Sequence, residues 1–287
     1  MRPFIISTDT TADLPAEFAA EHGISIHPLH YLIDDKEYGM EMGELSPHDF
    51  YQTMRDGKMP TTNATNLGYD IKLMEELVQE GNDILHISFS SQMSTSYNNA
   101  RLAAEEVMGR HPECRILVYD SKNATCGLSA LIRTMVKKKE SGCTLDEAAK
   151  WLEEILPRAV CYFTLPDLFH MWRGGRLKKS SAVLGTALKI QPVLHINDIG
   201  ALEPIKKVRG RAAAVKGLYA DLAEQCAAGK KPEIVCITHG DCPEEAEALA
   251  KTVKDTLGIS EVYISYLSPT LGSHSGPSTL TLGYISQ

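Results

Sequence analysis

The sequence predicts an α/β protein of two domains: an N-terminal Rossmann-like domain built on a parallel sheet, and a C-terminal α+β domain with a mixed or antiparallel sheet. Strand-like and helix-like segments alternate through the first half of the chain, which is typical of a parallel sheet covered on both faces. In the second half, the turn-forming run Asn197-Asp198-Ile199-Gly200 joins two apolar segments and indicates an antiparallel hairpin. The length of 287 residues allows two hydrophobic cores.

The first domain is expected to span residues 1–157, with a small insert at about 26–60. A capping box, Thr144-x-x-Glu147, begins a helix that Pro157 ends, and the boundary is placed there, so that residues 158–287 form the second domain. Prolines in a first turn and glycines after a last turn predict the other helix limits. The predicted strands are 3–7, 24–33, 83–88 and 115–119. The predicted helices are 13–23, 46–57, a helix of about 14 residues ending at Gly81, 97–108, 126–140 and 144–156.

In the second domain, strands and helices do not alternate as regularly as in the first. Its predicted strands are 160–164, 190–196, 201–207, 233–238 and 261–266, and its predicted helices are 167–172, a helix ending near Ala227, and 244–257. The run LGSHSGPST, residues 271–279, predicts a tight loop whose backbone can approach a ligand while His274 points toward it. An ordinary Gly-Pro turn with an exposed histidine is the alternative.

Composition excludes several classes of protein. Hydrophobic residues at 43% and charged residues at 23% are ordinary for a globular chain. No apolar run approaches the length of a transmembrane helix, and the N-terminus lacks the pattern of a signal peptide. The seven cysteines form no C-x-x-C pair, so we expect reduced thiols and a cytoplasmic location.

Charge is unevenly distributed along the chain. The formal net charge of −8 argues against nucleic-acid binding, yet ten basic residues and only two acidic ones lie between Arg173 and Lys216. Such a segment can dock an anionic partner, and it leaves room for transient contact with a membrane surface; a solvated face is the alternative. The residues predicted to dock a partner are Arg173, Lys206, Lys207 and Arg209.

Polar side chains follow four predicted segments of the first domain, in runs 8–11, 61–66, 88–96 and 120–123. In parallel sheets ligands bind beyond the carboxyl ends of the strands, so these runs are expected to meet around one ligand. The serine-rich run before the helix at 97 also offers free backbone N–H groups to an anionic head group. The alternative is that Ser94 or Ser96 only caps that helix.

Several enzyme signatures are missing. The run Gly272-Ser273-His274-Ser275-Gly276 has histidine where a nucleophile elbow has serine, and there is no G-x-G-x-x-G and no P-loop. His27-x-x-His30 and His239-x-x-Cys242 have loosely metal-like spacing without a second half, so no metal site is predicted.

The motifs together resemble the DegV family, whose characterised kind is the FakB-type fatty-acid-binding protein. The resemblance covers essentially the whole chain. It is carried, in order, by TDTTADL (8–14), the run 60–66, SSQMSTSY (90–97), Asp120-Ser121, Asp167-Leu168 with RGGRL (173–177), IQPVL (190–194) and GSHSGP (272–277).

The resemblance implies two α/β domains with a fatty acid buried between them and its tail running into the second. The implied carboxylate ligands are Thr62, Asn63, Ser94 and His274. Site support is implied for the set Asp9, Ser96, Asp120, Ser121 and Arg176. Gln92 and Thr95 stand where the family has glycine, and Asn63 stands where it has serine, which leaves the choice of acid open.

The implied function is to bind a long-chain fatty acid and to present its carboxylate to a separate fatty acid kinase subunit, which makes the acyl phosphate. The chain itself is then no enzyme and needs no cofactor or metal. Two alternatives stay open. One is a stand-alone hydrolase or acyltransferase that uses Ser94 or Ser275 with His274. The other is a binder of another small amphipathic acid.

Overall fold

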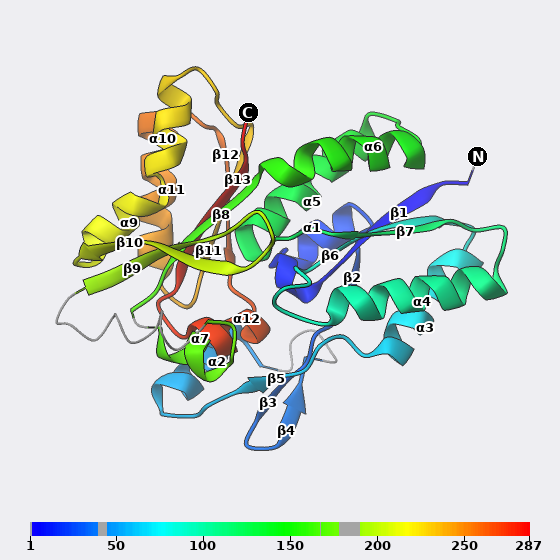
Figure 1. Ribbon diagram of the computed structural model, residues 1–287, viewed down its shortest axis with the longest axis horizontal. Helices are drawn as coiled ribbons and strands as arrows, with labels where there is room; N and C mark the ends of the chain where they lie inside the picture. Colours follow the sequence, from blue (N-terminus) through cyan, green and yellow to red (C-terminus); the bar gives the residue numbers. More distant parts are fainter. Residues whose placement is uncertain (1, 40–44, 167, 178–189) are drawn as a thin grey trace.

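The computed structural model describes residues 2–39, 45–166, 168–177 and 190–287, arranged around three sheets (Figure 1). Asp167, Lys178, Lys179 and Lys189, which entered the sequence predictions, lie outside these residues. The predicted class is confirmed, because one sheet is parallel and a second, separate sheet is mixed.

The first sheet has the strand order β2-β1-β6-β7 and all its pairs are parallel. Its strands are β1 (Phe4–Asp9), β2 (Ser25–His27), β6 (Asp83–Ser88) and β7 (Ile116–Asp120). Neighbouring positions of β6 face opposite cores: Ile84 packs against helices α3 (Leu67–Gln79) and α4 (Ser96–Arg110), and Leu85 belongs to the core on the other face.

Helix α5 (Thr125–Glu140) joins the first sheet to the second. It packs against β1 and also against strands of the six-stranded sheet, and its first half is buried all round. The approach to β13 is close, since a Cβ on Gly283 would lie 2.5 Å from the backbone of Cys126 and Gly127. The largest core cluster is therefore continuous from one sheet to the other. Helices α1 (Ala16–Glu21) and α6 (Leu145–Ile155) complete this layer. The domain boundary at 157 stays a prediction.

The six-stranded sheet has the order β10-β9-β8-β13-β11-β12, in which only β11 and β12 pair in parallel. The predicted hairpin is confirmed as β9 and β10. The strands are β8 (Ala159–Thr164), β9 (Ile190–Ile196), β10 (Leu202–Arg209), β11 (Ile234–His239), β12 (Glu261–Tyr266) and β13 (Leu280–Ile285). The helices described in this half are α7 (Phe169–Arg173), α9 (Arg211–Leu218), α10 (Ala220–Ala227), α11 (Pro243–Leu257) and α12 (Pro269–Ser275).

The insert forms the third sheet. Strands β3 (Tyr31–Ile33), β4 (Lys36–Tyr38) and β5 (Thr61–Thr62) pair antiparallel, and helix α2 (Pro47–Arg55) packs beside them. The single strand predicted at 24–33 is wrong, because the chain leaves the parallel sheet after β2 and enters this small sheet at β3. The run 61–66 was predicted to follow a strand of the parallel sheet. This prediction is wrong, because the run begins in strand β5 of the insert.

Three further predictions are corrected. The helix predicted at 13–23 is shorter: α1 begins only at Ala16, because Asp13 has a left-handed backbone (φ 51°) that ends the preceding 3-10 turn η1 (Thr10–Ala12), and Pro15 precedes the helix. The helix ending near Ala227 is two helices that meet at Tyr219. The predicted loop at 271–279 is helical as far as Ser275, where Gly276 (φ 82°) ends α12. A second 3-10 turn, η2 (Leu156–Arg158), follows α6.

Candidate functional site

A cavity of about 560 Å³ is lined by both halves of the chain and by the insert. This volume lies within the range of small-molecule sites. Five predicted site residues line it together: Thr62, Asn63, Ser94, Arg176 and His274. The other four, Asp9, Ser96, Asp120 and Ser121, are not among its lining residues. The segments that supply the five are far apart in sequence, and Thr62 and His274 meet because strand β5 of the insert and α12 lie side by side (Figure 1).

Thr62 and His274 form the closest polar pair in this cavity wall. Thr62 Oγ1, on β5, and His274 Nε2, near the end of α12, are 2.7 Å apart. The other ring nitrogen, Nδ1, is buried without a hydrogen-bond partner among the described residues. It faces Gly174, where a Cβ would lie only 2.1 Å from Nδ1. The ring thus fits this place because residue 174 has no side chain.

The His274 imidazole is neutral at physiological pH. Burial, followed by the nearby charges of Arg176 and Arg173, lowers the pKa of His274 to about 3. A neutral ring has one donor nitrogen and one acceptor nitrogen. If Nε2 carries the proton, it donates to Thr62 Oγ1, and the Thr62 hydroxyl proton remains for a ligand.

Ser94 lies in the hydroxyl-rich turn between β6 and α4. Its Oγ accepts a hydrogen bond from the Ser96 N–H at 3.2 Å and is 2.9 Å from Ser96 Oγ. Ser94 therefore satisfies a backbone donor at the helix start and also lines the cavity, and its role as a carboxylate ligand stays a prediction. Ser96 is buried behind it, and its Oγ accepts from the Thr65 N–H at 3.2 Å.

The remaining predicted support residues hold the loops around the cavity. Asp120 Oδ2 accepts from the Ser91 hydroxyl at 2.6 Å, and the Ser121 hydroxyl donates to Asn123 O at 3.1 Å. Asp9 Oδ2 accepts from the Phe89 N–H at 2.8 Å, at the point where the turn leaves β6. Burial raises the pKa of Asp9.

The two arginines of the RGGR run differ in environment. Arg176 lines the cavity and donates from Nε to Met93 O at 3.1 Å, and partial loss of hydration around its guanidinium lowers its pKa. Arg173, predicted to dock a partner, instead donates from Nη2 to Pro60 O at 2.9 Å and to Ser273 O at 3.2 Å. Arg173 thus ties the insert to α12. The exposed basic residues of the predicted docking set are Lys206, Lys207 and Arg209, all on β10.

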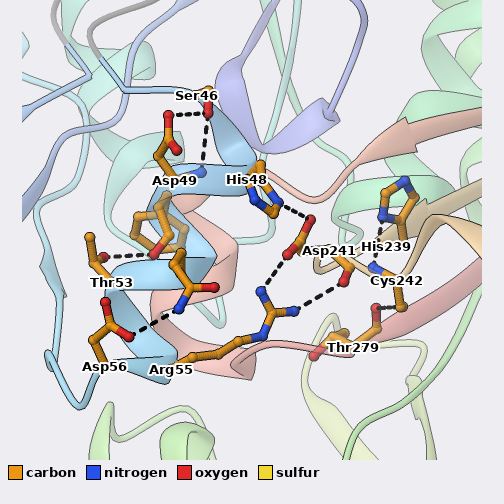
Figure 2. Close-up of polar contacts among 12 residues, drawn as sticks. Ser46, His48, Asp49, Thr53, Arg55, Asp56, His239, Asp241, Cys242 and Thr279 are labelled. Carbon is orange, nitrogen blue, oxygen red and sulfur yellow. Dashed lines mark hydrogen bonds and ion pairs between the residues drawn. The ribbon is translucent and has the colours of Figure 1, made fainter.

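Helix α2 of the insert supports α12 from the outside. A Cβ on Gly272 of α12 would lie 2.5 Å from Tyr51 Oη, so the two helices are in close contact. Figure 2 shows how α2 is held: the side chains of His48 and Arg55 both point to Asp241, in the loop after β11. His48 Nδ1 is 3.0 Å from Asp241 Oδ1, and Arg55 also donates to the Asp241 backbone oxygen at 3.1 Å.

Away from this polar wall, the cavity is mainly apolar. Its lining there includes Leu29, Phe89, Met93, Phe163, Met171, Ile196, Leu202, Leu267 and Leu271. The arrangement combines a small cluster of neutral hydrogen-bonding groups and one arginine with a long apolar wall. It suits a ligand that has an anionic or polar head and an apolar body.

The Ser–His pair that a hydrolase would need is not formed among the described residues. Ser94 Oγ is bonded within its own turn, and Ser275 Oγ is buried without a partner. His274 is paired with Thr62, and no carboxylate orients its Nδ1 within the described part of the chain.

Among the residues that the structure describes, no group of three or more histidine, cysteine or acidic side chains could hold a metal ion. None of the helices described has the length and apolar character needed to span a bilayer.

Sequence reasoning missed two residues that hold α12, namely Asp13 and Tyr51. Asp13 belongs to the run TDTTADL, but only Asp9 of that run was selected as a site residue. Tyr51 acts through packing between elements distant in sequence, for which a single sequence carries no signal. Gly174 belongs to the run RGGRL, but its role of making room for His274 is visible only in the structure.

Comparison with known proteins places these features in context. A family model described as "Uncharacterised protein, DegV family" matches residues 3–287. A DegV domain-containing protein of Clostridium perfringens is 34% identical over 286 residues, covering 99% of this chain and 98% of the relative. Among solved structures, DegV of Bacillus subtilis, described as a fatty acid binding protein, aligns with a TM-score of 0.88 at 27% identity over the whole of both chains. A DegV family protein from Thermus thermophilus, described by its fatty acid binding, has a TM-score of 0.88 at 25% identity, again over both whole chains.

Proposed function

The chain belongs to the DegV family, and from this premise we propose that it binds a long-chain fatty acid in the 560 Å³ cavity, with the carboxylate against Thr62 and Ser94. The observation that carries the proposal is that Thr62, Asn63, Ser94 and His274 line one cavity whose remaining wall is mainly apolar.

The polar wall supports a carboxylate because it supplies donors where a buried anion needs them. An unpaired buried carboxylate would be strongly destabilised by the loss of water. Neutral His274 donating to Thr62 leaves the Thr62 hydroxyl to donate to the ligand, and the Asn63 amide and Ser94 hydroxyl are further donors. Arg176 adds positive charge at the same wall.

The apolar wall supports a long alkyl tail. Burial of about 14 methylenes at ~0.8 kcal/mol each contributes roughly 11 kcal/mol before the costs of association. Before those costs are subtracted, this gain is comparable to the about 8–12 kcal/mol that corresponds to micromolar to nanomolar binding. A tail that enters between the sheets would touch the parts of the chain on either side of residue 157, which is where we place the domain boundary.

We further propose that the protein presents the bound carboxylate to a separate fatty acid kinase subunit, which forms the acyl phosphate, and that this chain has no catalytic role of its own. Two features support this. Several residues of the polar wall, including Asn63 and Arg176, are exposed, so the head group would be within reach of a partner. Lys206, Lys207 and Arg209 are exposed basic residues of edge strand β10, and an acidic surface could dock against this edge of the sheet.

Mass spectrometry tests the first proposal. Protein purified without detergent and then denatured should release a fatty acid close to one mole per mole, and delipidated protein should take up palmitate or oleate. Release of a different amphipathic acid would favour the alternative ligand class. If no acid is released and neither fatty acid binds, the proposal is wrong. Incubation with a fatty acid kinase and ATP, with acyl phosphate as the readout, tests the second.

A further inference from the structure

Helix α12, which carries His274, has a hollow on each side. The 560 Å³ cavity proposed to hold the fatty acid includes Leu267, Leu271 and His274 in its lining. A second cavity of about 590 Å³ includes Ser268 and Pro269 in its lining. Thr270 lines both cavities. A helix of seven residues has little stability of its own. Its position therefore depends on contacts with neighbouring elements, among them the bonds that hold its start.

The start of α12 is held by hydrogen bonds from three distant segments. Asp13 Oδ1 accepts from the Ser268 N–H at 2.9 Å, across 255 residues of sequence. The Tyr51 hydroxyl donates to Leu267 O at 2.9 Å, and the Leu267 N–H donates to His239 O at 2.9 Å. Of these three bonds, the one to Asp13 is the bond made by Ser268, the N-cap residue of α12.

Asp13 is in an unusual environment for an aspartate. It is buried, and its backbone has a left-handed conformation (φ 51°) that non-glycine residues seldom adopt. Burial raises the pKa of its carboxyl to about 7. A buried carboxyl at a costly backbone position is retained at a cost in stability, which is typical of a residue with a specific task.

We propose that Asp13 is a positioning residue for ligand binding: by holding the Ser268 N–H, it sets the start of α12 so that His274, six residues further on, meets Thr62. The inference rests on the proposed function. Six residues of helix span about 9 Å, so a small tilt at Ser268 displaces the imidazole. A hydrogen bond of 2.7 Å tolerates little displacement.

The same 3-10 turn also holds the other half of the polar wall. Asp9, four residues before Asp13, accepts from the Phe89 N–H and so fixes the start of the turn that contains Ser94. The run TDTTAD thus joins the two segments that supply the head-group ligands. In this arrangement the Asp13 side chain acts as a hydrogen-bond acceptor, and its charge is not required.

The experiment compares Asp13→Asn with Asp13→Gly. Asparagine keeps an acceptor oxygen and tolerates the left-handed backbone, whereas glycine keeps the backbone freedom but removes the acceptor. We expect Asp13→Asn to bind palmitate within about twofold of wild type, and Asp13→Gly to bind about tenfold more weakly. Asp35→Gly is the matched control, because Asp35 is exposed and has a similar backbone (φ 64°); it should leave affinity unchanged.

A second variant tests the bond from its other side. Ser268 has φ −57°, which proline adopts, so Ser268→Pro removes the donor N–H without forcing the backbone. It should weaken binding as much as Asp13→Gly, and the two changes combined should cost no more than one alone. This variant keeps the proposal testable if Asp13→Gly fails to fold.

The NMR signals of the His274 ring, recorded without ligand, separate this inference from the proposed function. They should move in Asp13→Gly and Ser268→Pro and return to their wild-type positions in Asp13→Asn. If wild type binds no fatty acid but these signals move as expected, only the proposed function fails. Unchanged ring signals and affinity in a folded Asp13→Gly protein would overturn the positioning role, and so would an equal loss in Asp13→Asn.

Discussion

Thr62 Oγ1 and His274 Nε2 lie 2.7 Å apart although 212 residues separate them in the sequence. One belongs to the insert and the other to the short helix before the last strand. Their contact joins the insert to α12 at the cavity wall, and the imidazole there is neutral. We propose that it orients the Thr62 hydroxyl toward the bound carboxylate.

Replacement of Thr62 tests this orientation. Thr62→Val keeps the shape but removes the hydroxyl, which leaves both His274 Nε2 and the bound carboxylate without a partner. We expect a loss of about ten- to a hundredfold in fatty acid affinity, corresponding to one or two lost hydrogen bonds to a charged group. Thr62→Ser keeps the hydroxyl and should bind within about threefold of wild type. Isothermal titration with palmitate measures both, and equal affinities for the two variants would contradict the role.

Gly174 provides a test that leaves every hydrogen-bonding side chain in place. A Cβ at this position would lie 2.1 Å from His274 Nδ1, so Gly174→Ala must displace the ring or the loop. We expect at least tenfold weaker fatty acid binding. The variant should still fold, because Gly174 is only partly buried. Gly109→Ala, at a helical glycine with open space around it, is the control and should bind normally. Normal binding by Gly174→Ala would show that the ring position is not critical.

The contact between α2 and the loop after β11, seen in Figure 2, predicts a linked loss of stability and binding. Asp241 is 8% exposed and is paired with Arg55 and His48. Arg55→Met leaves this carboxylate with a weaker partner, and we expect the free energy of unfolding to fall by about 1–2 kcal/mol. Affinity should fall as well, since α2 packs on α12.

Arg101→Met is the matched control for this prediction, because Arg101 pairs with Glu105 on an exposed helix surface. Its effect on the free energy of unfolding should be below about 0.5 kcal/mol, with no effect on ligand binding. Urea denaturation and titration of the same samples give both quantities. An equal effect of the two substitutions would mean that the Asp241 contact contributes no more than a surface pair.

Strong local patterns made the strands and most helices predictable. Strand β6 spans 83–88 as predicted, and the capping box at Thr144 begins α6 as predicted. Helix α12 was predicted as a loop because Gly272 and Ser273 are poor helix formers, yet Tyr51 packs where a side chain at 272 would stand. Tertiary contact thus overrides local propensity there, and a single sequence does not show the partner.

The candidate site was predictable to the extent that its residues carry ligand-binding chemistry. Thr62, Asn63, Ser94, Arg176 and His274 have hydroxyl, amide, guanidinium or imidazole groups within recognisable runs, and all of them line the cavity. The support residues were harder to separate from them. Asp120 and Ser121 are polar as well, but Asp120 accepts from the Ser91 hydroxyl in the neighbouring turn and Ser121 donates within its own turn, so both hold loops.

The titration of His274 predicts how stability depends on pH. The folded protein holds the pKa of this ring at about 3, whereas in the unfolded chain it is about 6.5. Below pH 6.5 the unfolded chain therefore binds a proton that the folded chain does not, so the stability linked to His274 is present above pH 6.5 and is lost as the pH falls toward 3.

His274→Gln removes this proton uptake and retains a side chain that can bond to Thr62. At pH 7.5 we expect the variant to be less stable than wild type or equal to it. At pH 5.0 its stability relative to wild type should improve by about 2 kcal/mol, which corresponds to 1.5 pH units at 1.36 kcal/mol each. Because every other titrating group is common to both proteins, the difference between their urea unfolding curves isolates His274. A pH-independent difference would mean that the ring titrates normally in the folded protein, and the neutral-donor role at Thr62 would then fail.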